Sequence, residues 1–166
     1  MKKLALFCVC ILALGFFAGC GKQSVKQNQD LNGEAKDAVL ADEPSVREDS
    51  YKDSNLEIVN FDFDKSDLTD EAKEKLKRNA TYLISPSNRD LKIVIEGHTD
   101  NRGTIAYNMC LGDERAKRVR KFYVLLGVES GRIATISYGK EKPANINNDE
   151  LGWAENRRAE TKVLAK

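Results

Sequence analysis

Strand-like and helix-like segments alternate along residues 56–166 of this 166-residue chain. Apolar and polar residues alternate over residues 56–63, as in a half-buried strand, and similar patterns predict further strands at 91–97, 132–139 and 157–164. The segments between the first three strands have helical periodicity. This alternation predicts an α+β fold, a two-layer sandwich in which two main helices pack on one face of a mixed four-stranded sheet.

Both helical segments contain specific start or stop signals. The first helix is expected to begin after Thr69, a good N-cap, since Asp70 and Glu71 then lie at the positive end of the helix dipole. Its buried face is expected to hold Ala72, Leu76, Ala80 and Leu83. The second helix is expected over residues 104–126, ending at Gly127, with its core face formed by Leu111, Ala116, Val119, Phe122 and Leu126. A short helical turn is expected around Trp153.

The N-terminus has the pattern of a secretory signal. Two lysines precede an apolar run from Leu4 to Ala18, and its 15 residues fall short of the roughly 20 needed to span a bilayer. The sequence FAGC, ending at Cys20, resembles the lipobox of bacterial lipoproteins, with Phe17 in place of the usual aliphatic residue. The resemblance implies that residues 1–19 are removed and that Cys20 carries lipid. Gly21 stands where inner-membrane retention uses aspartate, which points to the outer membrane.

The segment that follows is polar. Residues 21–55 are rich in Gln, Asn, Asp, Lys, Ser and Glu and contain few large hydrophobic side chains. They cannot bury enough apolar surface to offset the entropy lost on ordering, so we expect a disordered tether. The expected organisation is therefore a signal peptide at 1–19, a lipidated N-terminus and tether at 20–55, and one domain at 56–166.

Charge and cysteine content exclude some classes of protein. Removal of the signal leaves 27 − 2 = 25 basic against 26 acidic side chains, so no general field attracts nucleic acid. The charged run at residues 114–121 is expected to be the solvated face of a helix. Cys8 and Cys10 leave with the signal and Cys20 is lipidated, so only Cys110 remains and no intramolecular disulfide can form. We expect Cys110 to pack as a small hydrophobic residue.

The stretch IEGHTDNRGT, residues 95–104, holds the only histidine of the chain, His98, beside Asp100, an arginine and two glycines. His98 and Asp100 supply two ligands, whereas zinc sites usually need three or four, so neither a metal nor another cofactor is expected. Asp100 and His98 could together transfer a proton. However, the chain has no nucleophile elbow, paired-carboxylate signature or phosphate loop, and no catalytic residue is assigned.

Capture of a charged ligand is the third interpretation of this stretch. Asp100 follows a strand and precedes a helix, Gly103 permits the tight turn between them, and Asn108 and Arg115 share one side of that helix. A carboxylate and a guanidinium brought together can bind one zwitterion, through its ammonium and its carboxylate. The alternative is an Asp–Arg pair that only ties a loop to a helix. Spacing alone leaves both open.

Four ordered motifs carry a family resemblance. FDFDKSDLTDEAKEKLKRNATYL, IEGHTDNRGTIAYNMCLGDERA, ISYGKEKP and WAENRRAE together resemble the OmpA-like peptidoglycan-binding domain over about Val59 to Thr161. This family binds the peptidoglycan stem peptide non-covalently through diaminopimelate. The resemblance implies that Asp100 takes the ligand's ammonium and Arg115 its carboxylate. It places further peptidoglycan-binding positions at Phe63, Asp64, Asn108, Leu111, Ala116 and Arg158, leaves open whether Arg157 and Arg158 contact ligand or hold the fold, and makes His98 structural.

The resemblance also implies a role. It indicates a non-enzymatic outer-membrane lipoprotein, anchored through lipid on Cys20, that tethers the membrane to peptidoglycan and acts with Tol proteins such as TolB in envelope integrity and cell division. Two alternatives remain at this point: a periplasmic lipoprotein that binds other proteins without binding peptidoglycan, and an envelope enzyme acting on peptidoglycan.

Overall fold

The structure, a computed structural model, describes residues 50–164. The predicted signal peptide, Cys20 and the predicted tether up to residue 49 lie outside the described residues. The described elements are, in order, β1 (Ser50–Tyr51), β2 (Val59–Asn60), α1 (Asp70–Ile84), β3 (Ile93–His98), α2 (Ile105–Leu125), a 3-10 turn (Ser130–Arg132), β4 (Ile133–Gly139), α3 (Glu150–Asn156) and β5 (Arg158–Leu164).

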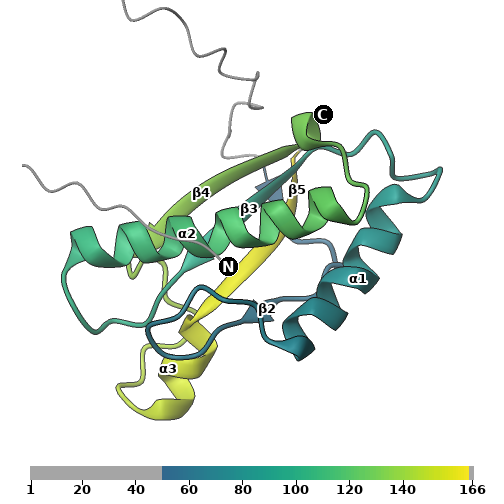
Figure 1. Cartoon of the computed structure of the whole chain (residues 1–166). Helices are drawn as coiled ribbons and strands as arrows, with labels where there is room; N and C mark the ends of the chain where they lie inside the picture. The colour runs from purple at the N-terminus through teal and green to yellow at the C-terminus, as the bar shows by residue number, and fades with distance from the viewer. Residues whose placement is uncertain (1–49, 165–166) are drawn as a thin grey trace, which may run out of the picture. The chain divides into compact units, whose positions relative to one another are not determined.

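The strands form one mixed sheet in the order β1-β5-β3-β4, and β2 also pairs with β5. The β3–β4 pair is parallel, and every pair that includes β5 is antiparallel. In Figure 1, α2 lies across β3 and β4, α1 packs beside it, and α3 lies at the end of the sheet where β5 begins. The predicted α+β fold is confirmed, with one short strand more than expected.

The start of α1 follows its local signals. The Ala72 backbone N–H donates to Thr69 Oγ1 at 3.1 Å, which satisfies one of the unpaired donors of the first turn. The predicted face is buried in a single core together with side chains of α2 and the sheet, and its members are Ala72, Leu76, Ala80 and Leu83. The capping residue and the apolar spacing therefore predicted this helix correctly.

Residues 50–55 belong to the described fold, although they were expected to form the end of the tether. Ser50 pairs with Leu164 and Tyr51 with Val163 at the outer edge of β5. The Tyr82 hydroxyl donates to the Asp53 carboxylate at 2.7 Å. An open strand edge can pair with a polar segment, and composition does not reveal such pairing.

The first predicted strand is shorter than its sequence pattern. β2 is confined to Val59–Asn60, which pair with Ala159 and Arg158, and β5 has no residue left to pair with the chain beyond Asn60. The backbone of Glu57 is satisfied instead by the side chain of Asn79 on α1, which accepts from its N–H and donates to its carbonyl, both at 2.9 Å. A buried amide thus replaces a strand partner there.

Helix α2 crosses β3 so closely that the backbones of the two elements are in contact. A Cβ placed on Gly97 would lie 1.9 Å from the carbonyl oxygen of Gly112, so only glycine fits at this crossing. The buried positions of α2 are Asn108, Gly112, Arg115, Ala116, Val119 and Tyr123. Cys110 lies off this face and is exposed, which corrects the expectation that it packs as a hydrophobic residue.

Within residues 50–164, no helix is both long and apolar enough to cross a membrane.

Candidate ligand-binding site

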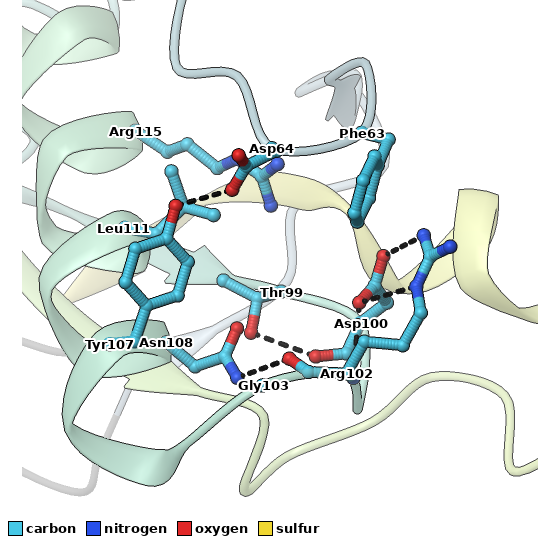
Figure 2. Close-up of a pocket in the computed structure, with 10 residues that line it drawn as sticks. All are labelled: Phe63, Asp64, Thr99, Asp100, Arg102, Gly103, Tyr107, Asn108, Leu111 and Arg115. Atoms are coloured by element: carbon cyan, nitrogen blue, oxygen red, sulfur yellow. Dashed lines mark hydrogen bonds and ion pairs between the residues drawn. The ribbon is translucent and has the colours of Figure 1, made fainter.

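A cavity of about 250 Å³ opens at the C-terminal end of β3. Three segments line it: the loop after β2, the loop between β3 and α2, and one side of α2 (Figure 2). The lining residues are Phe63, Asp64, Thr99, Asp100, Arg102, Gly103, Tyr107, Asn108, Leu111 and Arg115. The structure therefore brings together most of the residues that the sequence predicted for the site.

Two left-handed turns shape the cavity. Gly103 has a φ of +85°, which a glycine adopts without strain, and Thr104 then caps α2 by accepting from the Tyr107 N–H at 3.2 Å. Asp64 has a φ of +58°, an uncommon conformation for a residue with a Cβ. This turn places Asp64 beside Phe63 at the cavity wall, and its carboxylate accepts a short hydrogen bond from the Tyr107 hydroxyl.

Asp100 is buried, and both of its carboxylate oxygens accept hydrogen bonds from Arg102. Its Oδ1 accepts from the backbone N–H of Arg102 at 3.2 Å and from Arg102 Nε at 3.3 Å, while Oδ2 accepts from Arg102 Nη2 at 2.7 Å. Arg157 Nη1 lies 3.5 Å from Oδ2. Burial alone would raise the pKa of Asp100, but the hydrogen bonds from Arg102 hold the pKa below its ordinary value. Asp100 is therefore a carboxylate at neutral pH.

Arg115 is fully buried, and its guanidinium joins two backbone segments, the loop after β2 and the end of β3. It donates from Nε to Lys65 at 2.9 Å, from Nη1 to His98 at 2.8 Å and from Nη2 to Asp62 at 3.2 Å, in each case to the carbonyl oxygen. Burial lowers the pKa of Arg115 to about 10, against the opposing effect of the Asp100 charge, so the side chain stays cationic at neutral pH. A guanidinium has five N–H donors, so the three bonds leave two of them for another acceptor.

Asn108 holds the loop that carries Asp100. Its amide nitrogen donates to the carbonyl of Arg102 at 2.7 Å and to that of Thr104 at 3.0 Å. Figure 2 shows this side chain reaching from α2 toward the loop, opposite Phe63. The predicted position of Asn108 on the same side of α2 as Arg115 is thus seen in the structure.

Arg102 was not singled out as a site residue. Its guanidinium carbon lies 3.9 Å from the ring centre of Phe63 and 4.2 Å from that of Trp153, while its nitrogens face Asp100. The sequence offered one signal, an arginine two residues after the candidate aspartate. The contact with Trp153 depends on the tertiary fold, since α3 lies far along the chain.

Two predicted site residues lie away from the cavity. Ala116 is fully buried in the hydrophobic core and is not among the lining residues. Arg158 is not among the lining residues, and its Nε donates to Glu160 Oε1 at 2.6 Å on β5. Its neighbour Arg157 faces Asp100 instead and also donates to Phe61 O at 3.1 Å. Arg157 caps the end of α3 and Arg158 begins β5, and the two side chains have different surroundings.

The His98 side chain also lies outside the cavity. It is buried and stacks on Tyr138 with the ring centres 5.6 Å apart, and it contributes to the site through its carbonyl, which holds Arg115. Among the described residues, no group of three or more His, Cys, Asp or Glu is placed to hold a metal ion. The cavity is lined by two carboxylates, two guanidinium groups and an apolar wall, a set that suits a zwitterion on a short aliphatic chain.

Comparisons with known proteins show what the chain is similar to in sequence. A sequence model of the OmpA family matches residues 60–157. The peptidoglycan-associated lipoprotein of Pseudomonas aeruginosa is 35% identical over 175 residues, covering 98% of each chain. That of Pseudomonas putida is 36% identical over 171 residues, covering 96% of this chain and 97% of the relative.

Solved structures extend the likeness to three dimensions. The crystal structure of the peptidoglycan-associated lipoprotein from Burkholderia pseudomallei matches with a TM-score of 0.60 and 42% identity, over 64% of this chain and 88% of that one. The C-terminal domain of Helicobacter pylori MotB matches with a TM-score of 0.61 and 21% identity, over 67% of this chain and 86% of that one, and shows a shared fold alone.

Proposed function

Because the chain belongs to the OmpA family, as its motifs predicted, we propose that its cavity binds peptidoglycan non-covalently. The relatives that match almost the whole chain are peptidoglycan-associated lipoproteins, which supports a general role at the cell wall. The observation that carries the proposal is that Asp100 and Arg115 line one cavity of about 250 Å³, a size suited to part of a peptide.

The ligand in this proposal is the diaminopimelate residue of the stem peptide. The end of its side chain carries an ammonium and a carboxylate on one carbon. Asp100 takes the ammonium, and Arg115 takes the carboxylate through the two N–H groups that its backbone bonds leave available. Phe63, Tyr107 and Leu111 line the remaining wall and pack against the methylene chain.

The proposed role is a tether between the outer membrane and the cell wall. Lipid on Cys20 anchors the chain in the outer membrane, residues 21–49 span the gap, and the domain binds peptidoglycan. Each copy can bind peptidoglycan weakly and the attachment can still be firm. Many copies in one membrane bind the same cell wall, and each bound copy keeps the other copies close to further binding sites. Partners among the Tol proteins, such as TolB, belong to the same proposal, as does a role in envelope integrity and cell division.

The proposal includes no catalytic step. The relatives that match almost the whole chain are named for association with peptidoglycan and not for a reaction. Asp100 is held in two ion pairs, with Arg102 and Arg157, and its lowered pKa makes it a weak base, poorly suited to proton abstraction near neutral pH.

Co-sedimentation with purified sacculi that contain diaminopimelate tests the proposal. The full chain, purified in detergent, should sediment with the sacculi, and Asp100→Asn should remain mostly in solution. Asp90→Asn is the matched control, since Asp90 is exposed in the loop before β3, at the opposite end of that strand from Asp100. If the wild-type chain stays in solution, the protein-binding alternative is favoured. Release of soluble muropeptides from the same sacculi would favour the enzyme alternative.

A further inference from the structure

Both oxygens of Asp100 are already bound by a cation of this chain. Arg102 reaches Oδ2 through Nη2 at 2.7 Å and Oδ1 through Nε at 3.3 Å. Figure 2 shows the Arg102 side chain folded back so that its guanidinium faces the carboxylate. An ammonium that approaches Asp100 therefore meets an occupied acceptor.

Arg102 is the mobile member of this ion pair. Its side chain is 33% exposed, whereas that of Asp100 is 6% exposed. Arg102 has several rotatable bonds and can turn into solvent, where its charge is hydrated at little cost. Asp100 has a short side chain fixed at the end of β3 and cannot follow it.

Two aromatic rings hold Arg102 in place. The rings of Phe63 and Trp153 lie 3.9 Å and 4.2 Å from its guanidinium carbon, on different elements of the fold. Contacts of this kind are weak at exposed sites. They favour the paired position without locking it, which suits a group that can be displaced.

A second cation, Arg157, also lies beside Asp100. Asp100 therefore cannot accept an ammonium as long as Arg102 stays paired with it. Arg157 Nη1 lies 3.5 Å from Oδ2, and Arg157 is itself fixed by Phe61 and by Glu150, whose Oε1 lies 2.7 Å from its Nη2. A bound ammonium would be the third positive group around one buried carboxylate, and like charges at such distances repel strongly in a buried site. Exchange avoids this repulsion.

We propose that Arg102 is a displaceable counter-ion of Asp100, and that the ammonium of the ligand takes its place while the guanidinium leaves both Asp100 and Trp153. The inference rests on the proposed function, since it concerns the same cavity. It also explains why the site would select a zwitterion over a simple amine. A simple amine gains one ion pair and breaks another, whereas a zwitterion also binds Arg115 and so gains a net interaction.

The single tryptophan of the chain makes the exchange observable. Trp153 contacts Arg102 but is not among the residues that line the cavity. Its fluorescence therefore reports the position of Arg102 rather than direct contact with a ligand. Adding meso-diaminopimelate to the full chain in detergent should change the Trp153 emission along the same saturation curve as binding measured by calorimetry.

Arg102→Gln supplies the second arm of the test. With the competing cation removed, meso-diaminopimelate should bind about fivefold more tightly, and the ligand-dependent change in emission should disappear. Arg89→Gln is the matched control, because Arg89 is exposed in the loop after α1, and it should behave as the wild-type chain does.

The outcomes separate this inference from the proposed function. Calorimetric binding by the wild-type chain without a change in emission overturns the exchange and leaves the proposed function standing. Weaker binding by Arg102→Gln also overturns it, since Arg102 would then support the ligand rather than compete with it. Absence of calorimetric binding by the wild-type chain overturns both. The emission measurement on the wild-type chain needs no substitution, so the inference stays testable even if Arg102→Gln folds poorly.

Discussion

Arg115 Nη1 donates a 2.8 Å hydrogen bond to the carbonyl oxygen of His98, the last residue of β3. The cation that we assign to the ligand carboxylate therefore also fixes the strand end from which Asp100 follows. Ligand capture and a structural tie between loop and helix were alternatives when spacing alone was considered. The structural tie was expected as an Asp100–Arg115 pair, but Asp100 pairs with Arg102 and Arg157 instead. Arg115 makes a tie of another kind, to backbone carbonyls, and this tie holds its guanidinium at the cavity.

Replacing Arg115 should therefore affect stability as well as binding. Arg115→Ala leaves the carbonyls of Lys65, His98 and Asp62 without their donor and should lower the free energy of unfolding by about 3 kcal/mol or more, measured by urea denaturation. Arg118→Ala is the control on the same helix, since its ion pair with Asp67 is long and exposed, and it should cost less than about 1 kcal/mol. Equal losses for the two variants would contradict the structural role.

The crossing of α2 and β3 should not tolerate a side chain at Gly97. A Cβ there would lie 1.9 Å from Gly112 O, so Gly97→Ala must push the helix from the strand and should cost about 3 kcal/mol in thermal or urea unfolding. Gly131→Ala, where a Cβ meets nothing within 4 Å, should change stability by no more than about 0.5 kcal/mol. A stable Gly97→Ala variant would show that the helix does not lie this close.

A buried network around Tyr123 should contribute to stability. Its hydroxyl accepts from Asn79 Nδ2 at 3.0 Å and lies 3.0 Å from Thr161 Oγ1, and burial raises the pKa of Tyr123 to about 12. Tyr123→Phe leaves both partners short of one hydrogen bond and should cost about 1–3 kcal/mol in urea unfolding. Tyr51→Phe, at an exposed tyrosine, serves as the comparison and should be close to neutral. A neutral Tyr123→Phe would mean that the network adds little.

Local sequence signals predicted the elements well. The cap at Thr69, the apolar face of α1 and the stop at Gly127, whose φ is +98°, depend on residues close together in the chain. These signals depend on backbone conformation and helical periodicity, which the sequence displays directly. The same periodicity placed Asn108 and Arg115 on one side of α2.

Features that depend on distant segments were missed. The pairing of Ser50 with Leu164 requires an open edge of β5, and the contact between Arg102 and Trp153 requires α3 to pack beside the β3–α2 loop. Composition and periodicity contain no information on either. Cys110 is exposed because its position on α2, and not its residue type, decides whether it is buried.

Stability should depend on the ionisation of Asp100. Burial alone would raise its pKa, but the bonds from Arg102 lower the pKa below its ordinary value of 3.8 in the folded chain. A depressed folded pKa means that the stabilisation is present above 3.8 and is lost as the pH falls through the folded pKa. The difference in unfolding free energy between the wild-type chain and Asp100→Asn should therefore be largest at neutral pH and shrink below about pH 4. A difference that is constant from pH 7 to 3 would rule out this linkage.

The central claim is that Asp100 recognises the ammonium of a zwitterion whose carboxylate is bound by Arg115. The most direct measurement compares the dissociation constants of meso-diaminopimelate and pimelate, which has the same carbon chain and carboxylates but no ammonium, for the wild-type chain and for Asp100→Asn. The wild-type chain should prefer meso-diaminopimelate by about tenfold, and Asp100→Asn should bind the two ligands equally. If Asp100→Asn keeps the wild-type preference, the ammonium is bound elsewhere and the account of this site is wrong.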